Sequence, residues 1–253
     1  MTKHKFAAFD IDGTLFRSGL YREVVYELIR MKALPKRILM ELSEQESAWQ
    51  KRTHGNAFKE FEQAQADLLD AHLPKLKVKD FEAAAKSVIK NQKDNVYVYT
   101  RELSKKLKKD GYTLIAISGS QVELVEPFAK HYNFDIWVAQ HHLRDGEYFT
   151  GESIKTHKGK DNIIRKLLPV HNLTLEGSIG IGDSRGDIGM LSLTHNSIAF
   201  NPDDHLFEAA QENNWKIVVE RKNMIYELER NGSKQCYNLA ASHTHDNALR
   251  NDG

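Results

Sequence analysis

The chain has 253 residues, of which 40% are hydrophobic and 28% are charged, so it can bury a substantial core. Its 36 basic and 35 acidic residues nearly cancel, and this balance argues against electrostatic binding to nucleic acid or to an anionic membrane. No apolar run approaches the roughly 20 residues of a membrane span, and Asp10 interrupts the first apolar stretch too early for a signal peptide. The single cysteine, Cys236, excludes an intramolecular disulfide and a zinc site built from thiolates. We therefore expect a soluble, cytoplasmic globular protein, and the sequence leaves its oligomeric state open.

The first predicted element is a short buried strand. Residues Lys5–Ile11 (KFAAFDI) form an apolar run that stops at an Asp-Gly turn. Apolar residues then recur at helical spacing from Leu20 to about Gln92, and two prolines interrupt the pattern. This segment predicts about four helices and no strand.

Helices and strands alternate over the rest of the chain. The predicted helices cover residues 99–109, 122–131, 161–168 and 206–212, and the predicted strands cover residues 112–117, 134–139, 178–181, 197–200 and 216–219. A hairpin turn is predicted at residues 144–147. Alternation of buried strands with helices implies a parallel sheet covered by helices on both faces, which is an α/β fold. Residues 231–253 are polar without a sustained period, which predicts a disordered tail.

Three predicted strands end in small, polar or acidic residues: DIDGT at 10–14, SGS at 118–120 and GDSRGD at 182–187. Because the carboxyl ends of strands in an open parallel sheet form the ligand crevice, we expect these residues to meet at one edge. Crowded carboxylates raise one another's pKa and therefore need a cation. No histidine or cysteine stands at ligand spacing beside them. Oxygen ligands alone favour a hard ion, and Mg²⁺ is the usual one where a phosphate shares the site.

Together with a lysine near residue 160, these three segments resemble the four ordered motifs of the haloacid dehalogenase superfamily of phosphatases. The resemblance covers about residues 5–220, and the helical insertion between the first two motifs resembles the cap of the phosphoserine-phosphatase-like branch. It implies a Rossmann-like, doubly wound parallel sheet core with an inserted all-helical cap domain. We assign residues 1–16 and 93–230 to the core and residues 17–92 to the cap. The implied activity is Mg²⁺-dependent hydrolysis of a small phosphorylated metabolite, with no nucleic-acid or membrane partner.

The resemblance also implies roles for the first two motifs. Asp10 would be the nucleophile that forms an aspartyl-phosphate. Asp12 would be the general acid for the leaving alcohol and then the base for the hydrolytic water. Ser118, with the backbone amide of Gly119, would hold the phosphoryl oxygens. Phosphoryl transfer needs little beyond such positioning and charge neutralisation.

The remaining acidic residues are implied to form the metal site. Asp183 would bind Mg²⁺ together with Asp10 and the backbone carbonyl of Asp12. Asp187 would be an outer ligand of the ion or would orient the motif lysine. Mg²⁺ is therefore the cofactor that the resemblance implies.

The motif lysine is either Lys158 or Lys160. A helix that begins just after this lysine should bury residues about three, four and seven positions further on. From Lys160 these positions hold Ile163, Ile164 and Leu167, whereas from Lys158 they hold polar or charged residues. The apolar pattern favours Lys160, which would neutralise the phosphoryl group and the nucleophile.

Two other functions remain compatible with the sequence. The first is a phosphotransferase or mutase, in which the phosphoryl group of the same aspartyl-phosphate would pass to a sugar or an alcohol and not to water. Alternatively, the chain would be a non-catalytic binding or regulatory module with a relic site. The intact set of carboxylates argues against this last function.

The substrate is the feature that the sequence specifies least. Phosphoserine phosphatases place an acidic residue shortly after the first motif, where it reads the substrate amine. At that spacing this chain has RSGLY at 17–21 and no acid before Glu23, which argues against phosphoserine. The candidate substrate contacts in the cap are Arg17, Tyr21, Trp49, Arg52 and His54.

Overall fold

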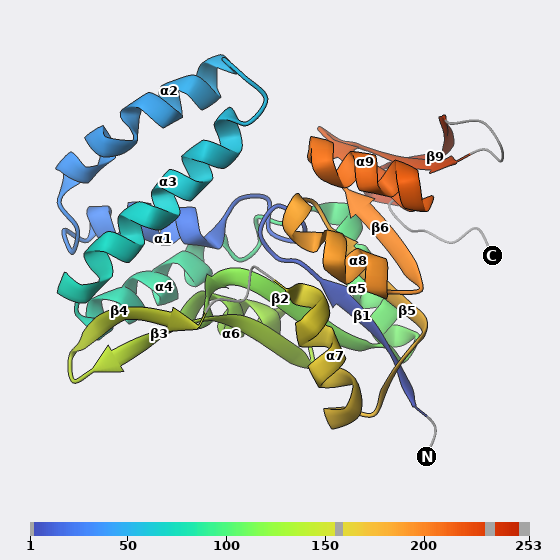
Figure 1. Cartoon of the computed structure of the whole chain (residues 1–253), viewed down its shortest axis with the longest axis horizontal. Coiled ribbons are helices and arrows are strands. Elements are labelled where there is room, and N and C mark those ends of the chain that lie inside the picture. The colour runs from blue at the N-terminus through green and yellow to red at the C-terminus, as the bar shows by residue number, and fades with distance from the viewer. Residues whose placement is uncertain (1–2, 155–158, 231–235, 248–253) are drawn as a thin grey trace.

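One mixed sheet lies at the centre of the computed structural model, which describes residues 3–154, 159–230 and 236–247 (Figure 1). Within these residues the sheet has nine strands in the order β4-β3-β2-β1-β5-β6-β7-β8-β9. Neighbouring strands from β3 across to β7 run parallel, and the pairs β3–β4, β7–β8 and β8–β9 run antiparallel. The strands are β1 (His4–Phe9), β2 (Thr113–Gln121), β3 (Ile136–Asp145), β4 (Tyr148–Ile154), β5 (Leu173–Gly182), β6 (Asn196–Phe200), β7 (Lys216–Arg221), β8 (Met224–Arg230) and β9 (Tyr237–Thr244).

Helices cover both faces of the parallel part of the sheet. The helices on one face are α5 (Val98–Lys109) and α6 (Val122–His131), and those on the other are α7 (Lys160–Val170), α8 (Ile188–Leu193) and α9 (Asp204–Asn213). Strand β1 is buried on both sides, because Ala7 and Phe9 join the first cluster of side chains while Phe6 and Ala8 join the second. The apolar run before Asp10 thus forms a central strand. The predicted doubly wound α/β fold is confirmed.

The strand order reverses at β1, and this reversal determines where the motifs meet. Strand β2 lies on one side of β1 and β5 on the other, with Phe9 opposite both Ala116 and Ile181. The segments that leave the carboxyl ends of β1, β2 and β5 therefore emerge at the same edge of the sheet. In doubly wound sheets this reversal point is the usual ligand crevice.

The cap is formed by helices inserted between β1 and β2 (Figure 1). These are α1 (Leu20–Arg30), α2 (Ser43–Lys51), α3 (Ala57–His72) and α4 (Val78–Gln92), with short 3-10 segments η1 (Lys36–Leu42) and η2 (Leu73–Lys75). Helix α1 buries Leu20, Val24, Val25 and Leu28, which is the spacing of one helical stripe. The predicted insertion of about four helices is confirmed.

The β3–β4 hairpin connects the cap to the end of the sheet. The backbone N–H of Val78 donates to the carbonyl oxygen of Glu147 at 2.9 Å. Next to this hydrogen bond the rings of Phe81 and Phe149 meet edge to face, with 5.5 Å between their centroids. The hairpin turn predicted at residues 144–147 is confirmed, and it holds the start of α4 in place.

The expectation of a disordered tail over residues 231–253 is wrong for residues 237–244. They form β9, which pairs antiparallel with β8 at the edge of the sheet. The hydroxyl of Tyr237 lies 2.8 Å from the carbonyl oxygens of both Ala210 and Trp215, which anchors β9 at the end of α9. Because an edge strand leaves most side chains in water, β9 lacks the alternating buried apolar positions that would identify it in the sequence. Residues 231–235 and 248–253 lie outside the described residues.

Strand β8 and helix α8 are also absent from the sequence prediction. Helix α8 has six residues, which is too short for a helical period to be visible. In β8 the buried position after Ile225 is occupied by Glu227, whose carboxylate contacts Lys216 and, at 3.1 Å, His243. An inward-pointing charged residue hides the alternation that would identify the strand.

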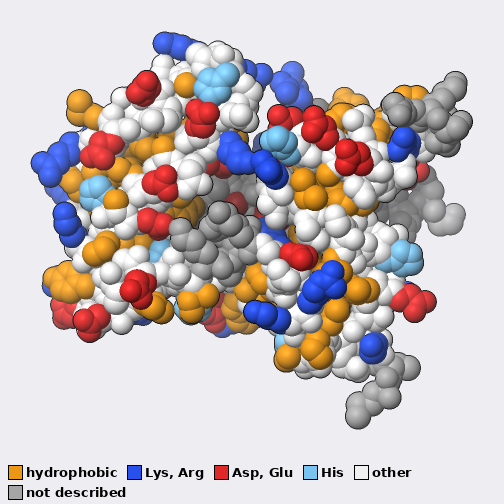
Figure 2. Space-filling view, in the orientation of Figure 1, with side chains coloured by type: hydrophobic (Ala, Val, Ile, Leu, Met, Phe, Trp, Pro, Cys, Tyr) orange, Lys and Arg blue, Asp and Glu red, His pale blue; other side chains and the backbone are white. Residues whose placement is uncertain are grey.

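The surface carries charges of both signs. Acidic and basic side chains are interspersed over the face shown in Figure 2, as the near-zero net charge leads one to expect. A notch at the upper edge of this view separates the cap from the core. None of the helices in the described parts of the chain is long and apolar enough to cross a membrane.

The anchoring of β9 predicts a measurable effect of Tyr237→Phe. The substitution keeps the ring but removes the hydroxyl, so we expect the free energy of unfolding to fall by about 1 kcal/mol. Urea denaturation followed by circular dichroism measures this change. Leu239→Ala on the same strand is the control, because Leu239 is 58% exposed and should change stability by less than about 0.5 kcal/mol. Equal effects of the two substitutions would contradict the anchoring role.

Candidate active site

Asp10 directly follows β1 and lies at the reversal point of the sheet. Its backbone N–H donates to the carbonyl oxygen of Ile181 on β5 at 2.9 Å, which extends the strand pairing past Phe9. The side chain is 6% exposed. Burial raises the pKa of the Asp10 carboxyl to about 7, although the charge of Lys160 acts in the opposite direction. Ionisation of Asp10 therefore depends on the cations placed next to it.

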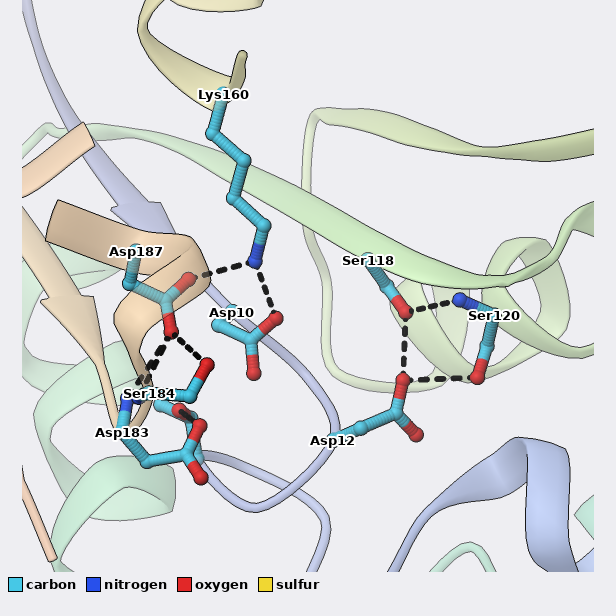
Figure 3. A network of polar contacts seen from close by, with 9 residues as sticks. Asp10, Asp12, Ser118, Ser120, Lys160, Asp183, Ser184 and Asp187 are labelled. Carbon is cyan, nitrogen blue, oxygen red and sulfur yellow. Dashed lines mark hydrogen bonds and ion pairs between the residues drawn. The ribbon is translucent and has the colours of Figure 1, made fainter. Parts of the chain in front are cut away.

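Lys160 supplies one such cation. Its Nζ lies 2.5 Å from Oδ1 of Asp10 and 2.6 Å from Oδ1 of Asp187 (Figure 3). Burial alone would lower the pKa of Lys160, but the two carboxylates raise it above the usual lysine value. The side chain therefore stays charged inside the protein.

The position of Lys160 follows from the start of α7. Gly159 precedes the helix with φ +82°, a conformation that glycine adopts without strain. Ile164 of this helix is fully buried, at one of the positions that a motif lysine at 160 predicts. Lys158 lies outside the described residues, so the preference for Lys160 over Lys158 stays a prediction.

Asp187 organises the loop after β5 and orients Lys160. Its Oδ2 accepts hydrogen bonds from the backbone N–H groups of Asp183 (3.2 Å) and Ser184 (3.1 Å) and from the Ser184 hydroxyl (3.1 Å). A Cβ on Gly182 would lie 2.4 Å from the Cβ of Asp187, so a larger residue does not fit there. Both oxygens of Asp187 are thus engaged by protein donors. This arrangement suits a positioning residue better than a direct metal ligand.

Asp183 completes a group of three crowded carboxylates. One oxygen from each of Asp10, Asp183 and Asp187 lies within 4.8 Å of the other two. Burial raises the pKa of Asp183 well above its usual range, and the neighbouring charges of Asp10 and Asp187 raise it further. Thr14 donates its hydroxyl to Oδ1 of Asp183 at 2.9 Å. One lysine does not neutralise three carboxylates, so this set of oxygen donors fits a hard divalent cation.

The Asp12 carboxylate points away from these three carboxylates (Figure 3). Its Oδ1 accepts the backbone N–H of Leu20, the first residue of α1, at 2.6 Å. Its Oδ2 accepts the hydroxyls of Ser118 (2.7 Å) and Ser120 (2.8 Å) at the end of β2. Burial raises the pKa of Asp12, and these three donors oppose the rise. Asp12 therefore links the loop after β1 to both β2 and the cap.

The predicted site residues lie in two adjacent groups. The first group contains Asp10, Lys160, Asp183 and Asp187. The second contains Asp12 and Ser118, with Gly119 between the two serines of the motif. Ser120, for which the motifs predicted no role, also contacts Asp12 through its buried hydroxyl. The available signal was its spacing from Ser118, because residues two apart on a strand point to the same side.

The candidate substrate contacts in the cap divide into packed and exposed residues. The hydroxyl of Tyr21 donates to the carbonyl oxygen of Ala66 on α3 at 2.7 Å, and Trp49 stacks on Phe61 with 5.1 Å between ring centroids. Both side chains therefore take part in packing within the cap. The exposed candidates are Arg17, Arg52 and His54.

Comparison with known proteins identifies the family to which this chain belongs. The family model of haloacid dehalogenase-like hydrolases matches residues 7–192, a segment that includes every motif described above. The chain belongs to this family. The relatives and solved structures that it resembles include phosphoserine phosphatases.

One curated relative of this haloacid dehalogenase-like hydrolase is the phosphoserine phosphatase SerB1 of Mycobacterium tuberculosis. It is 28% identical over 127 residues, which cover 49% of this chain and 41% of that protein. The matched region thus spans about two fifths of the relative's length.

Solved structures share most of this fold. A protein of unknown function from Bordetella pertussis Tohama I has a TM-score of 0.69 at 18% identity, covering 87% of this chain and 99% of its own. A phospho-aspartyl intermediate analogue of phosphoserine phosphatase has a TM-score of 0.61 at 21% identity, covering 87% of this chain and 95% of its own. At these identities the likeness shows the fold, a Rossmann-like core with a helical cap.

The pairing of Lys160 predicts a large effect of Lys160→Ala on stability. The substitution leaves Asp10 and Asp187 buried without their cation, so we expect the free energy of unfolding to fall by about 3–5 kcal/mol at neutral pH. Urea denaturation measures this value. Lys166→Ala on the same helix is the matched control, because Lys166 is exposed. A loss no greater than that of the control would show that the buried ion pairs do not hold the site together.

Proposed function

We propose that this haloacid dehalogenase-like hydrolase is a phosphomonoester hydrolase that acts through an aspartyl-phosphate on Asp10. The strongest support is the position of Lys160, which bridges the buried carboxylates of Asp10 and Asp187 within a group of three crowded carboxylates. An anionic phosphate reaches Asp10 only where the surrounding negative charge is neutralised. The structural neighbour described as a phospho-aspartyl intermediate analogue supports the same chemistry.

Asp10 and Asp12 carry out the two half-reactions in this proposal. A carboxylate oxygen of Asp10 attacks phosphorus, the bond from phosphorus to the alcohol oxygen breaks, and Asp12 gives its proton to that oxygen. Water then attacks the aspartyl-phosphate, Asp12 takes a proton from the water, and Asp10 is regenerated as inorganic phosphate leaves. The raised pKa of Asp12 favours the protonated form that the first step requires.

Three groups would hold the transferring phosphoryl group. The positive charge of Lys160 would stabilise the negative charge that develops on the phosphoryl oxygens. The hydroxyl of Ser118 rotates freely about its own bond, so it can exchange its contact with Asp12 (2.7 Å) for a contact with a phosphoryl oxygen. The backbone N–H of Gly119 is the third donor in this proposal.

Mg²⁺ is the cofactor that we propose for the carboxylate group. Asp10, Asp183 and the backbone carbonyl of Asp12 would hold it, because Asp187 already accepts hydrogen bonds at both oxygens. The ion would supply positive charge against the phosphoryl oxygens. The raised pKa of Asp183 supports this assignment, since crowded carboxylates favour a bound cation.

The substrate in this proposal is a small phosphorylated metabolite enclosed between the cap and the core. We assign residues 17–92 to the cap and residues 1–16 and 93–230, extended by β9, to the core. The hydrogen bond from the N–H of Leu20 to Asp12 supports this arrangement, because it places the first turn of the cap against the acid that would serve the leaving group.

Asp10→Asn tests the proposed nucleophile. We expect phosphate release from phenyl phosphate to fall by at least about a thousandfold, because an amide oxygen is a poor nucleophile toward phosphorus. Circular dichroism should show an unchanged fold. Asp110→Asn, at an exposed position far along the chain, is the control and should keep full activity. Undiminished hydrolysis by Asp10→Asn would remove the proposal.

Mg²⁺ should also stabilise the folded chain. At a concentration about a hundred times its dissociation constant, a ligand of the folded state adds about 2.7 kcal/mol to the free energy of unfolding. We expect Asp183→Asn to abolish this gain. Without Mg²⁺ the same variant should be more stable than the wild type, because it removes one of three repelling carboxylates. Thermal denaturation with and without Mg²⁺ measures both effects, and equal Mg²⁺ stabilisation of the variant would contradict the metal site.

A further inference from the structure

Gln121 is a fully buried amide beside the site. It is the last residue of β2 and the N-cap residue of α6, yet its side chain makes no capping hydrogen bond. The side chain is 0% exposed, and neither Oε1 nor Nε2 makes a hydrogen bond of normal length and angle within the described residues. Burial of an amide in this way removes its hydrogen bonds to water without replacing them. Native structures contain few such groups, and those that occur have a functional or structural cause.

Gln121 lies next to the groups that hold Asp12. The preceding residue, Ser120, donates its hydroxyl to Oδ2 of Asp12 at 2.8 Å. The Gln121 amide lies close enough to the phenol of Tyr21, in the first turn of α1, for a weak polar contact. The phenol donates its own proton to the carbonyl oxygen of Ala66. Gln121 therefore contacts the first helix of the cap and directly follows a serine that binds the proposed general acid.

Other polar side chains continue from Gln121 onto the middle of β3. Gln140 lies opposite Gln121 in the parallel register. Its Nε2 is 3.3 Å from Nε2 of His142 and 3.2 Å from Oγ of Ser153. His142 in turn lies 4.0 Å from Asp70 of α3. The boundary between the cap and this end of the sheet is thus lined by hydrogen-bonding groups.

We propose that Gln121 recognises a hydroxyl group of the leaving alcohol, so that this chain acts on phosphorylated polyols or sugars. This inference rests on the proposed phosphomonoester hydrolase function and adds the class of substrate. Displacement of α1 exposes the amide to water, and closure over a bound substrate replaces that water with the substrate hydroxyl. Closure without such a substrate leaves the amide unpaired, so closure is coupled to the correct leaving group.

The chemistry of the amide selects a hydroxyl over other substituents. The amide presents an acceptor at Oε1 and donors at Nε2, and a hydroxyl is both donor and acceptor. A carboxylate on the leaving group cannot donate a hydrogen bond, so it would leave Oε1 of Gln121 unpaired. It would also bring a second negative charge toward Asp70. An ammonium group cannot accept a hydrogen bond, so it would leave Nε2 of Gln121 unpaired. An apolar leaving group would pair with neither Oε1 nor Nε2.

Gln121→Met tests the inference, because methionine has a similar length and volume without the amide. The measurement is kcat/KM for glycerol phosphate and for hexose phosphates, each compared with phenyl phosphate, whose leaving group carries no further hydroxyl. We expect the wild type to prefer at least one hydroxylated substrate. Gln121→Met should lower this preference by about tenfold or more, with phenyl phosphate hydrolysis changed by less than about twofold.

Gln65→Met is the matched control. Gln65 is a second buried amide whose Nε2 has no partner within the described residues, but it belongs to α3 and lies beside Tyr26 of α1. We expect this variant to leave the substrate preference unchanged. Gln121→Glu keeps the side-chain size but replaces the donor end with an acceptor, and it should lower the preference as Gln121→Met does.

Two results would overturn the inference. In the first, the wild type hydrolyses phenyl phosphate at least as well as every hydroxylated substrate. In the second, Gln121→Met lowers the hydrolysis of all substrates in parallel or lowers only the melting temperature, which would give Gln121 a structural role alone. Both results leave the phosphomonoester hydrolase proposal standing, because that proposal depends on the loss of phenyl phosphate hydrolysis in Asp10→Asn.

Discussion

Repulsion among three crowded carboxylates, two of them buried and one half-buried, at the carboxyl end of β1 is the constraint on which the rest of the site depends. Asp10, Asp183 and Asp187 come from segments far apart in the sequence and place their oxygens within 4.8 Å of one another. Burial is the largest cause of the raised pKa of Asp10 and Asp183, so folding holds these groups against their preference for water. Lys160 offsets part of that cost. The remaining negative charge favours a further cation, and the cation in turn favours a phosphate.

Close approach of the backbone makes this crowding possible. Gly13 has φ +84°, and a Cβ at this position would lie 2.3 Å from Oδ2 of Asp183. A Cβ at Gly182 would collide with the side chain of Asp187 in the same way. Each glycine therefore allows a loop to pass nearer to a carboxylate than any larger residue permits. Replacement of either glycine would separate the carboxylates and reduce both their repulsion and their affinity for a cation.

Elements with a strong local pattern were predictable from the sequence, and elements determined by tertiary contacts were not. Helix α6 covers the predicted residues 122–131, because an apolar stripe on a helix leaves a visible period. Strand β9 leaves no such trace, since it is an edge strand anchored by the hydroxyl of Tyr237. In the site, the motifs predicted which residues meet, because parallel strands bring their carboxyl ends to one edge. The orientation of Asp12 depends on where α1 places the N–H of Leu20, and no local sequence pattern encodes that position.

The two carboxylates of the first motif have different surroundings although they are two residues apart. Asp10 faces Lys160 and the other carboxylates, whereas Asp12 faces uncharged donors from Leu20, Ser118 and Ser120 (Figure 3). A cation bound by the carboxylate group would therefore lower the pKa of Asp10 far more than that of Asp12. The same event would leave one residue ionised as a nucleophile and the other able to carry a proton. One donor to Asp12, the backbone N–H of Leu20, belongs to α1. Movement of the cap would therefore change the hydrogen bonds of Asp12, the proposed proton carrier, and would leave the contact between Asp10 and Lys160 in place.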